Sequence, residues 1–432
     1  MALLTRLLVL ILLAGVFLIS GTSCSGDGGS GDGVSPDPDD GGTTNPDTSA
    51  TSDWDHAPSY IDPGTDAGNP HYNSGGGRIV RISGTTIALV NDGTRERLYR
   101  TTDNGENWTL IDDEPGFSSS LVSGPDNMVY HFTRHGGDLR MVRFPYDAAT
   151  LPAPAAIGSG VDNGSNHGAY AMLNATVNEA GDLFVFWHHD LGGADGYDTI
   201  QMIRSMDGGD TWGAPHTVRE GADGDSWGYV HSDVTTDGDL VIVYSEWGAE
   251  TNQFGVSGDN GENWSHMAVT DNGATSNPCI LPAGNDDLYI FAQNRTLDGL
   301  AFRKSTNSGM TWTPWTSIQA NALMGYADPS PALGADGTIY VAFRGLDTPT
   351  QYSDDLRAYV AMSADGGATW TFPDNHLSGG RVGTRSTMRY QTWHNYGGPL
   401  EWTWLEEDGD DTGIYPTMYD INAGVLIHNL AN

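Results

Sequence analysis

An eight-residue pattern, Ser/Thr-x-Asp-x-Gly-x-x-Trp, recurs along the chain and limits its fold more than any other feature. The five copies end at Trp108, Trp212, Trp264, Trp312 and Trp370. The copy that ends at Trp312 carries Asn307 in place of the aspartate. Successive tryptophans are 104, 52, 48 and 58 residues apart, and the first spacing equals two periods of 52. Such a regular period predicts a protein built from repeated structural units.

The residues of this pattern suit a tight turn between two β-strands. Glycine adopts a positive φ, while the aspartate carboxylate and the Ser or Thr hydroxyl satisfy amides of the turn. The tryptophan then packs its large apolar face under the neighbouring sheet. The pattern is known as the Asp box. We expect its role to be structural rather than catalytic.

A second unit precedes the boxes: an alternating strand, a glycine turn and a more apolar strand, as in HSDVTTDGDLVIVYSEW. About seven such units follow residue 54; one has no box, and the last is a divergent copy, also without a box. Short strands at even spacing predict an all-β fold with four-stranded antiparallel blades. We therefore expect a single β-propeller over residues 54–432, with seven blades, or six as the alternative, and with the Asp boxes at outer turns.

The N-terminal segment predicts export. Arg6 precedes an apolar run at residues 7–19 that is too short for a stable membrane span, so residues 1–23 are interpreted as a signal peptide. Cys24 follows small residues and resembles a bacterial lipoprotein processing site, which predicts lipidation there, with ordinary cleavage as the alternative. Residues 24–53, rich in Gly, Asp, Ser, Thr and Pro, predict a disordered acidic tether. The expected location is the cell surface or outer membrane, or the medium.

The charge balance excludes several classes of partner. The chain has 56 acidic and 19 basic side chains and a formal net charge of −37. A nucleic-acid binder needs a basic surface, so this class is excluded. Contact with a membrane is expected only through the N-terminal lipid. Two cysteines cannot supply a disulfide framework. We also expect the protein to be a monomer.

In a propeller, the residues just before the first strand and just after the second strand of each blade surround one mouth of the central channel. These positions hold seven of the 13 histidines, and also arginines, in a protein otherwise poor in positive charge. The candidate residues are Arg134, His167, His188, His189, Tyr229, His231, Tyr244, Arg295, Arg344 and Arg389. A cationic, aromatic mouth on an acidic protein predicts an anionic ligand.

The Asp boxes resemble those of the sialidases and related carbohydrate-active propellers, over roughly residues 70–425. For a sialidase, the resemblance implies three arginines on the substrate carboxylate and a tyrosine nucleophile assisted by a glutamate. Arg295, Arg344 and Arg389 are candidates for the triad, with Tyr390 and Glu246 as the pair. The Phe/Tyr-Arg-Ile-Pro motif of sialidases is absent.

The segment NHGAYAMLNATVNEAGDLFVFWHHD is similar to one in seven-bladed polysaccharide lyases, including ulvan lyases, because His167 and His188 bracket a strand-turn-strand at a separation of 21. The resemblance implies His167, His188 and Tyr229 as catalytic residues, and Arg295 or Arg134 on a uronic-acid carboxylate. Substrate contacts are then expected from Arg134, His189, His231, Tyr244, Arg295, Arg344 and Arg389.

We therefore predict a polysaccharide lyase that cleaves an anionic, uronic-acid-containing and ulvan-like polysaccharide by β-elimination. A sialidase-like glycoside hydrolase and a non-catalytic glycan-binding propeller are the alternatives. The reaction needs no redox cofactor. Structural calcium in the Asp-rich loops, or zinc at Cys279 and His231, stays open.

Overall fold

The computed structural model divides the chain into two units, Met1–Asn45 and Pro46–Asn432, and every residue that it describes lies in the second. The described residues are 77–91, 95–103, 107–135, 137–159, 173–190, 198–221, 227–246, 251–269, 275–284, 286–294, 297, 299–318, 329–334, 336–345, 357–372, 381–382, 400–408, 411–420 and 425–426. The predicted signal peptide, Cys24 and the tether lie outside them.

The described strands form seven antiparallel sheets, six with four strands and one with three, called blades one to seven in chain order. Blades one to four consist of β1 (Ile79–Ile82), β2 (Thr85–Asn91), β3 (Arg95–Thr101) and β4 (Thr109–Pro115); β5 (Phe117–Ser123), β6 (Met128–His135), β7 (Asp138–Pro145) and β8 (Ala155–Ser159); β9 (Asn174–Val177), β10 (Leu183–Asp190), β11 (Asp198–Ser205) and β12 (His216–Glu220); and β13 (Trp227–Val234), β14 (Leu240–Glu246), β15 (Thr251–Ser257) and β16 (Ser265–Ala268).

Blades five to seven complete the described strands. They consist of β17 (Thr275–Pro282), β18 (Leu288–Asn294), β19 (Gly299–Ser305) and β20 (Thr316–Ser317); β21 (Ser330–Leu333), β22 (Ile339–Gly345) and β23 (Arg357–Ser363); and β24 (Arg381–Val382), β25 (Leu400–Asp408), β26 (Asp411–Asp420) and β27 (Val425–Leu426). The chain is an all-β propeller with four-stranded antiparallel blades, as the repeats predict, and the seven described sheets correspond to the seven sequence units.

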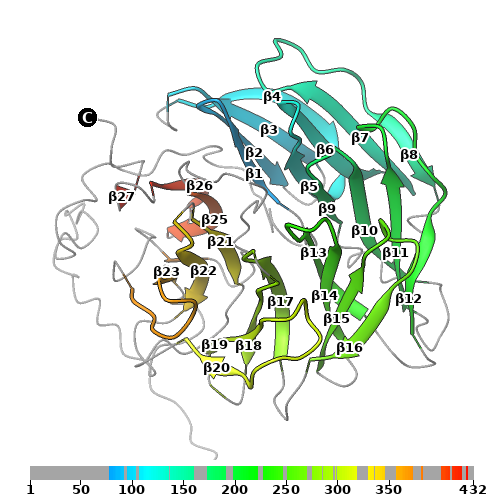
Figure 1. Ribbon diagram of the computed structural model, residues 1–432. Coiled ribbons are helices and arrows are strands. Elements are labelled where there is room, and N and C mark those ends of the chain that lie inside the picture. Colours follow the sequence, from blue (N-terminus) through cyan, green and yellow to red (C-terminus); the bar gives the residue numbers. More distant parts are fainter. Residues whose placement is uncertain are drawn as a thin grey trace, which may run out of the picture. The chain divides into compact units, whose positions relative to one another are not determined.

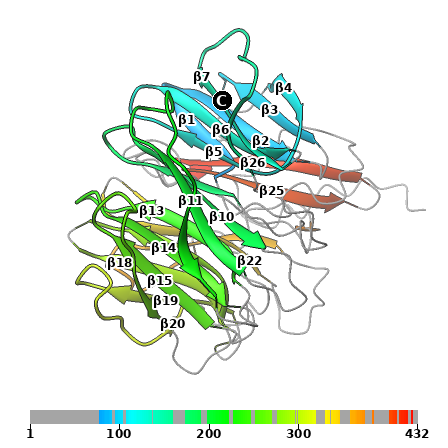
Figure 2. The ribbon, with the colours of Figure 1, turned by 90° about the vertical axis from the view of Figure 1, so that its right-hand side faces the viewer.

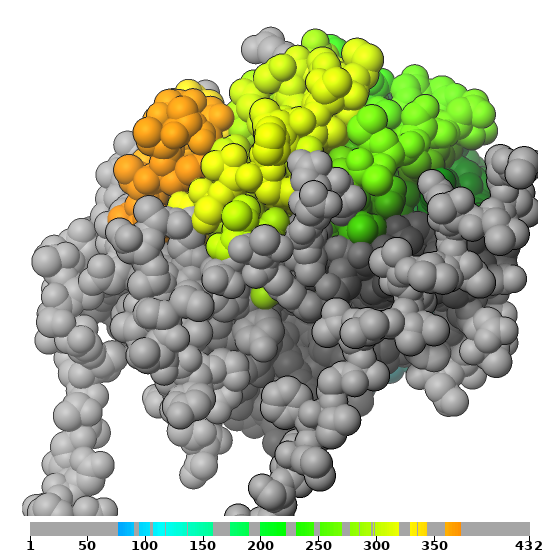
Figure 3. Space-filling model, turned by 90° about the horizontal axis from the view of Figure 1, so that it is seen from below, coloured from blue at the N-terminus to red at the C-terminus, as the bar shows by residue number. Residues whose placement is uncertain are grey.

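The first strands of the blades follow one another in space. Contacts join β1 to β5, β5 to β9, β9 to β13, β13 to β17 and β17 to β21 (Figure 1). Within a blade the strands lie side by side in chain order, as β13, β14 and β15 do (Figure 2). Viewed from below, the fourth, fifth and sixth blades form adjacent green, yellow and orange bands (Figure 3).

Alternating side chains of each second strand fill the space between neighbouring blades. Tyr130 and Phe132 of β6 pack with Leu183, Val185 and Trp187 of β10. The intervening β10 residues face the other way and pack on β14. Since successive side chains of a strand point to opposite faces, each second strand contributes to two interfaces.

The Asp-box turns have the predicted chemistry. In the box of blade three, Ser205 Oγ donates to Asp207 Oδ1 over 2.7 Å and accepts from the amide of Gly209 over 2.8 Å. Thr211 donates its amide to Oδ1 and its hydroxyl to Oδ2. These hydrogen bonds lower the pKa of Asp207 to about 2. Asn307 makes the corresponding contacts in blade five.

Four of the five box tryptophans, Trp212, Trp264, Trp312 and Trp370, pack against the preceding blade. Trp212 meets Phe132 edge to face, with ring centroids 5.8 Å apart, and Trp264 meets Phe186 at 5.9 Å. This packing confirms the predicted position of the tryptophans under the neighbouring sheet. Such pairs stabilise by about 0.5–1.5 kcal/mol beyond their buried area.

Single side chains also connect the innermost strands. The amide of Leu173, just before β9, donates to Ser118 Oγ of β5 over 3.0 Å, and the amide of Ala175 donates to Ser120 Oγ over 3.1 Å. These hydrogen bonds satisfy buried polar groups at the inner edges of blades two and three.

Candidate active site at the ends of the second strands

The second strands of successive blades place corresponding residues at one end of each inner hairpin. Packing between blades defines the correspondence: Phe132, Phe186, Val243 and Phe291 each face the next blade. Two residues further along these strands lie Arg134, His188, Ser245 and Gln293. Because side chains alternate, these four also face the next blade. Arg344 occupies the same backbone position in β22.

His188 and His189 are adjacent in β10 but face opposite interfaces. His188 follows Phe184 and Phe186 in facing blade four, whereas His189 follows Trp187 in facing blade two. His188 is buried and 5% exposed, and His189 is partly buried. The two histidines therefore lie in different interfaces, and only His188 faces the blade that contains Tyr229.

Tyr229 lies in β13, the innermost strand of blade four, and β13 contacts β10. The register of β13 on β14 shifts between Gly228 and His231, so Tyr229 and Val230 form a β-bulge opposite Tyr244. Bulges redirect side chains and are frequent next to active sites. His188 and Tyr229 thus come from two strands in contact, at the end of the hairpins where the sequence predicts the mouth.

The bulge recurs in the inner strands of two other blades. In β5 it includes Ser118, whose φ is 63°, and lies opposite Arg134 and Thr133. In β17 it includes Asn277, whose φ is 52°, and Pro278. Non-glycine residues at positive φ are strained and collect at functional sites. Pro278 inside a strand is the sequence signal for this bulge, since proline disrupts a regular ladder.

Arg134 lies within β6 rather than after it, and its side chain is only 1% exposed. Its position places it at the interface of blades two and three, on the face of β6 that meets Trp187 and His189 of β10. Arg134 and His188 therefore occupy corresponding positions one blade apart, each directed to the following interface.

Tyr244 is fully buried between blades three and four. Its hydroxyl lies 3.1 Å from Nδ1 of His266, and His266 Nε2 donates to the carbonyl of Val218 over 3.0 Å. Because Nε2 carries the proton, Nδ1 accepts from the tyrosine. Burial lowers the pKa of His266, in agreement with a neutral ring. Tyr244 therefore packs in the core, where its hydroxyl is used by His266.

His231 and Cys279 each make a contact within the inner strands. The Ile280 amide donates to His231 Nδ1 over 3.4 Å, and Cys279 Sγ donates to the carbonyl of Pro329 over 2.9 Å. His231 and Cys279 are both buried. In the part of the chain that the structure describes, no three His, Cys, Asp or Glu side chains are grouped as metal ligands.

Six candidates cannot be placed by their side chains. His167, Arg295, Arg389 and Cys24 lie outside the described residues, and Tyr229 and Arg344 are described by their backbone alone. The side chains of the alternative pair, Glu246 and Tyr390, cannot be placed either. Glu246 is the last residue of β14 and is described by its backbone alone, and Tyr390 lies outside the described residues.

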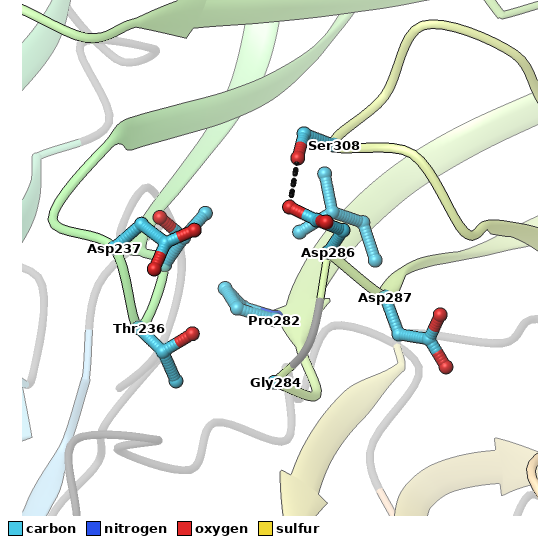
Figure 4. A pocket seen from close by; sticks show the side chains of 9 residues that line it. Thr236, Asp237, Pro282, Gly284, Asp286, Asp287 and Ser308 are labelled. Atoms are coloured by element: carbon cyan, nitrogen blue, oxygen red, sulfur yellow. Dashed lines mark hydrogen bonds between the residues drawn. The ribbon is translucent and has the colours of Figure 1, made fainter.

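The opposite ends of the inner hairpins are acidic. The turns between first and second strands carry Asp126, Asp182, Asp237, Asp286 and Asp336. A shallow depression there, between blades four and five, is lined by Asp237, Asp286 and Asp287, and Ser308 donates to Asp286 (Figure 4). Burial, together with the charges of Asp237 and Asp286, raises the pKa of Asp239. This end repels anions, so an anionic ligand favours the Arg and His end.

In the described part of the chain, no helix is both long and apolar enough to cross a membrane.

Comparison with known proteins finds a similarity to one family model over part of the chain. The model of the BNR repeat-like domain matches residues 166–324. No curated protein matches the chain.

Among solved structures, polysaccharide lyase Uly1 is similar at 11% identity and a TM-score of 0.50, over 87% of this chain and 94% of that one. Puromycin hydrolase is similar at 13% identity and a TM-score of 0.52, over 86% of this chain and 56% of that one. The Hadza microbial sialidase Hz136 is 16% identical with a TM-score of 0.48, over 78% and 74% of the two chains. At these identities the similarity shows the fold alone.

Proposed function

We propose that the protein is a polysaccharide lyase that cleaves an anionic, uronic-acid-containing polysaccharide, of the ulvan-like type, by β-elimination. One observation carries the proposal: His188 is directed from blade three towards blade four, whose inner strand bulges at Tyr229. The fold shared with a polysaccharide lyase supports it. His167, outside the described residues, is the third proposed catalytic residue.

The chemistry fits these residue types. The proton at C5 of a uronic acid becomes acidic when a cation neutralises the neighbouring carboxylate and stabilises the enolate-like intermediate. His188 or Tyr229 removes this proton, and a neighbouring group protonates the leaving glycosidic oxygen. Histidine suits both steps, because its ordinary pKa lies near working pH. The C–O bond breaks as the C4–C5 double bond forms, so neither water nor an oxidant is consumed.

Two arginines are proposed to act on the carboxylate in different ways. Arg295, just after β18, is the candidate for direct contact. Arg134 is buried, so it supplies positive charge from within the interface of blades two and three, where a low dielectric strengthens its field. His189, at the same interface, His231, Arg344 and Arg389 complete the proposed substrate-binding set. Tyr244 is left out because it contacts His266 in the core.

Arg344 keeps a second function open. It occupies in blade six the position that Arg134 holds in blade two, as expected for a member of the carboxylate-binding triad of a sialidase-like hydrolase. In that alternative Arg295, Arg344 and Arg389 bind the carboxylate, with Tyr390 and Glu246 as the nucleophile and its assistant.

Incubation with a panel of uronic-acid polysaccharides, followed by ultraviolet absorbance, separates the functions. The lyase creates an unsaturated uronate, which absorbs, whereas a hydrolase releases reducing ends without absorbance. Sialic-acid release from sialylated glycans would support the hydrolase. Binding without any product would support the glycan-binding alternative.

We also propose that the protein is exported as a monomer, either secreted or held at the cell surface by a lipid on Cys24. A propeller on an acidic tether could then reach a large polysaccharide outside the cell.

A further inference from the structure

A charged pair is fully buried between the first two blades. Glu96, near the start of β3 in blade one, lies 3.0 Å through Oε2 from Nε2 of His131 in β6 of blade two. The two side chains are 0% and 1% exposed. A buried charge is costly unless it is paired and hydrogen-bonded, so this pair requires a local explanation.

Further groups of blade two hold the Glu96 carboxylate. Burial alone would raise the pKa of Glu96, but the hydrogen bond and charge of His131 and the hydroxyls of Thr133 and Ser119 bring it below its ordinary value of 4.5. Arg78, which is also fully buried, donates from Nη1 to Ser119 Oγ over 3.1 Å. The carboxylate of blade one is therefore held as an anion by groups of the next blade.

The geometry of His131 identifies its proton. Nε2 faces the carboxylate, while Nδ1 is buried and has no hydrogen-bond partner among the described residues. Nε2 therefore carries the proton that His131 donates to Glu96, and Arg78 adds a permanent positive charge to the cluster.

Other charged groups face the cluster from both blades. Asp112 and Glu114 of β4 lie opposite Leu98 and Glu96 of β3. Burial and the charge of Glu114 raise the pKa of Asp112, although His131 opposes this. Arg140 of β7 lies on the face shared by Val142 and Phe144, which pack on blade one.

The chain that connects the two blades closes over Glu96. A Cβ atom on Gly116, between β4 and β5, would lie 2.4 Å from Thr133 Oγ1 and 3.3 Å from Cδ of Glu96. Only glycine allows the connection to pass this close, and the carboxylate cannot leave without moving it.

We propose that Glu96, His131, Ser119 and Arg78 form a pH-sensitive lock between the first and second blades, closed while Glu96 is ionised and opened when Glu96 takes up a proton. The sign follows from the lowered pKa of Glu96. The lock contributes its full stability above pH 4.5, the ordinary value, and loses it as the pH falls towards the lower folded-state value. Acid should therefore open the propeller first at this joint.

The test compares the melting temperature of the full chain with that of Glu96→Gln across pH 7 to pH 3. The variant should melt lower at pH 7, by about 5 °C or more, and the difference should shrink below pH 4.5. Glu220→Gln, an exposed glutamate of β12, is the matched control and should follow the wild type at every pH.

A second measurement protects the test against a variant that does not fold. In the wild type, amide hydrogen exchange, corrected for its intrinsic pH dependence, should accelerate below pH 4.5 in β3 and β6 before it does so in β14 and β18. A pH-independent difference for Glu96→Gln, or equal acceleration in all four strands, would overturn the proposal. Both measurements are independent of any catalytic activity.

Discussion

Replacing Tyr244 by phenylalanine tests whether this residue acts in the fold or on the substrate. The change removes only the hydroxyl that donates to His266 Nδ1 over 3.1 Å. It leaves a partly buried acceptor unsatisfied, which costs about 1–2 kcal/mol. Since the tyrosine lies in the core between blades three and four, we expect turnover to stay within about two-fold of wild type.

The free-energy cost of Tyr244→Phe should depend on pH, because the partner of the hydroxyl, His266, titrates. Burial lowers the pKa of His266 below its ordinary value of 6.5, so the neutral ring contributes stability above pH 6.5 and this contribution is lost at lower pH. Protonated His266 cannot accept from Tyr244. The stability difference between wild type and Tyr244→Phe should therefore be largest above pH 6.5 and should shrink as the pH falls.

Chemical denaturation at a series of pH values measures this difference. Tyr289→Phe is the matched control, because its hydroxyl donates to the carbonyl of Gly366 over 3.1 Å and no histidine is involved. Its cost should be constant between about pH 5 and 8. A pH-independent cost for Tyr244→Phe, or a ten-fold loss of turnover at unchanged stability, would refute the structural role.

Three further predictions follow from the packing and the sequence. Phe186→Ala removes the ring that meets Trp264 and should lower the free energy of unfolding by about 3–5 kcal/mol, measured by denaturation. Asp207→Asn should leave the melting temperature at neutral pH nearly unchanged, because Asn307 makes the same turn contacts in its own box; a large decrease would show that the charge matters. Mass spectrometry of protein from its host should find cleavage before Cys24, with or without a lipid, and an intact N-terminus would contradict export.

The sequence predicts the architecture because the Asp box is a local device. Ser205, Asp207 and Thr211 lie within seven residues of one another, so their hydrogen bonds can be inferred from spacing alone. The position of Trp212 under the preceding blade follows from the same repeat. Because this local chemistry recurs in every unit that carries a box, the sequence predicts both the turn and the packing of its tryptophan against a neighbouring blade.

The candidate site is harder to predict, because it depends on which face of a strand each side chain occupies. Adjacent residues His188 and His189 appear equivalent in the sequence, yet they face different interfaces. The bulge at Tyr229 arises from the pairing of β13 with β14, and no local residue pattern specifies the shift in register. Glu96 and His131 meet only because two blades pack together, 35 positions apart in the chain.

The most direct test of the central claim is the rate of unsaturated-uronate formation by His188→Ala on a polysaccharide that the wild type cleaves. Loss of the acid/base group should lower turnover by roughly 10²–10⁴-fold. Because His188 is buried, turnover is measured well below the melting temperature of the variant. His216→Ala is the control, since His216 contacts the carbonyl of Gly261 near an Asp box, and its turnover should stay near wild type. Near-full activity of His188→Ala, or an equal loss in His216→Ala, would contradict the account.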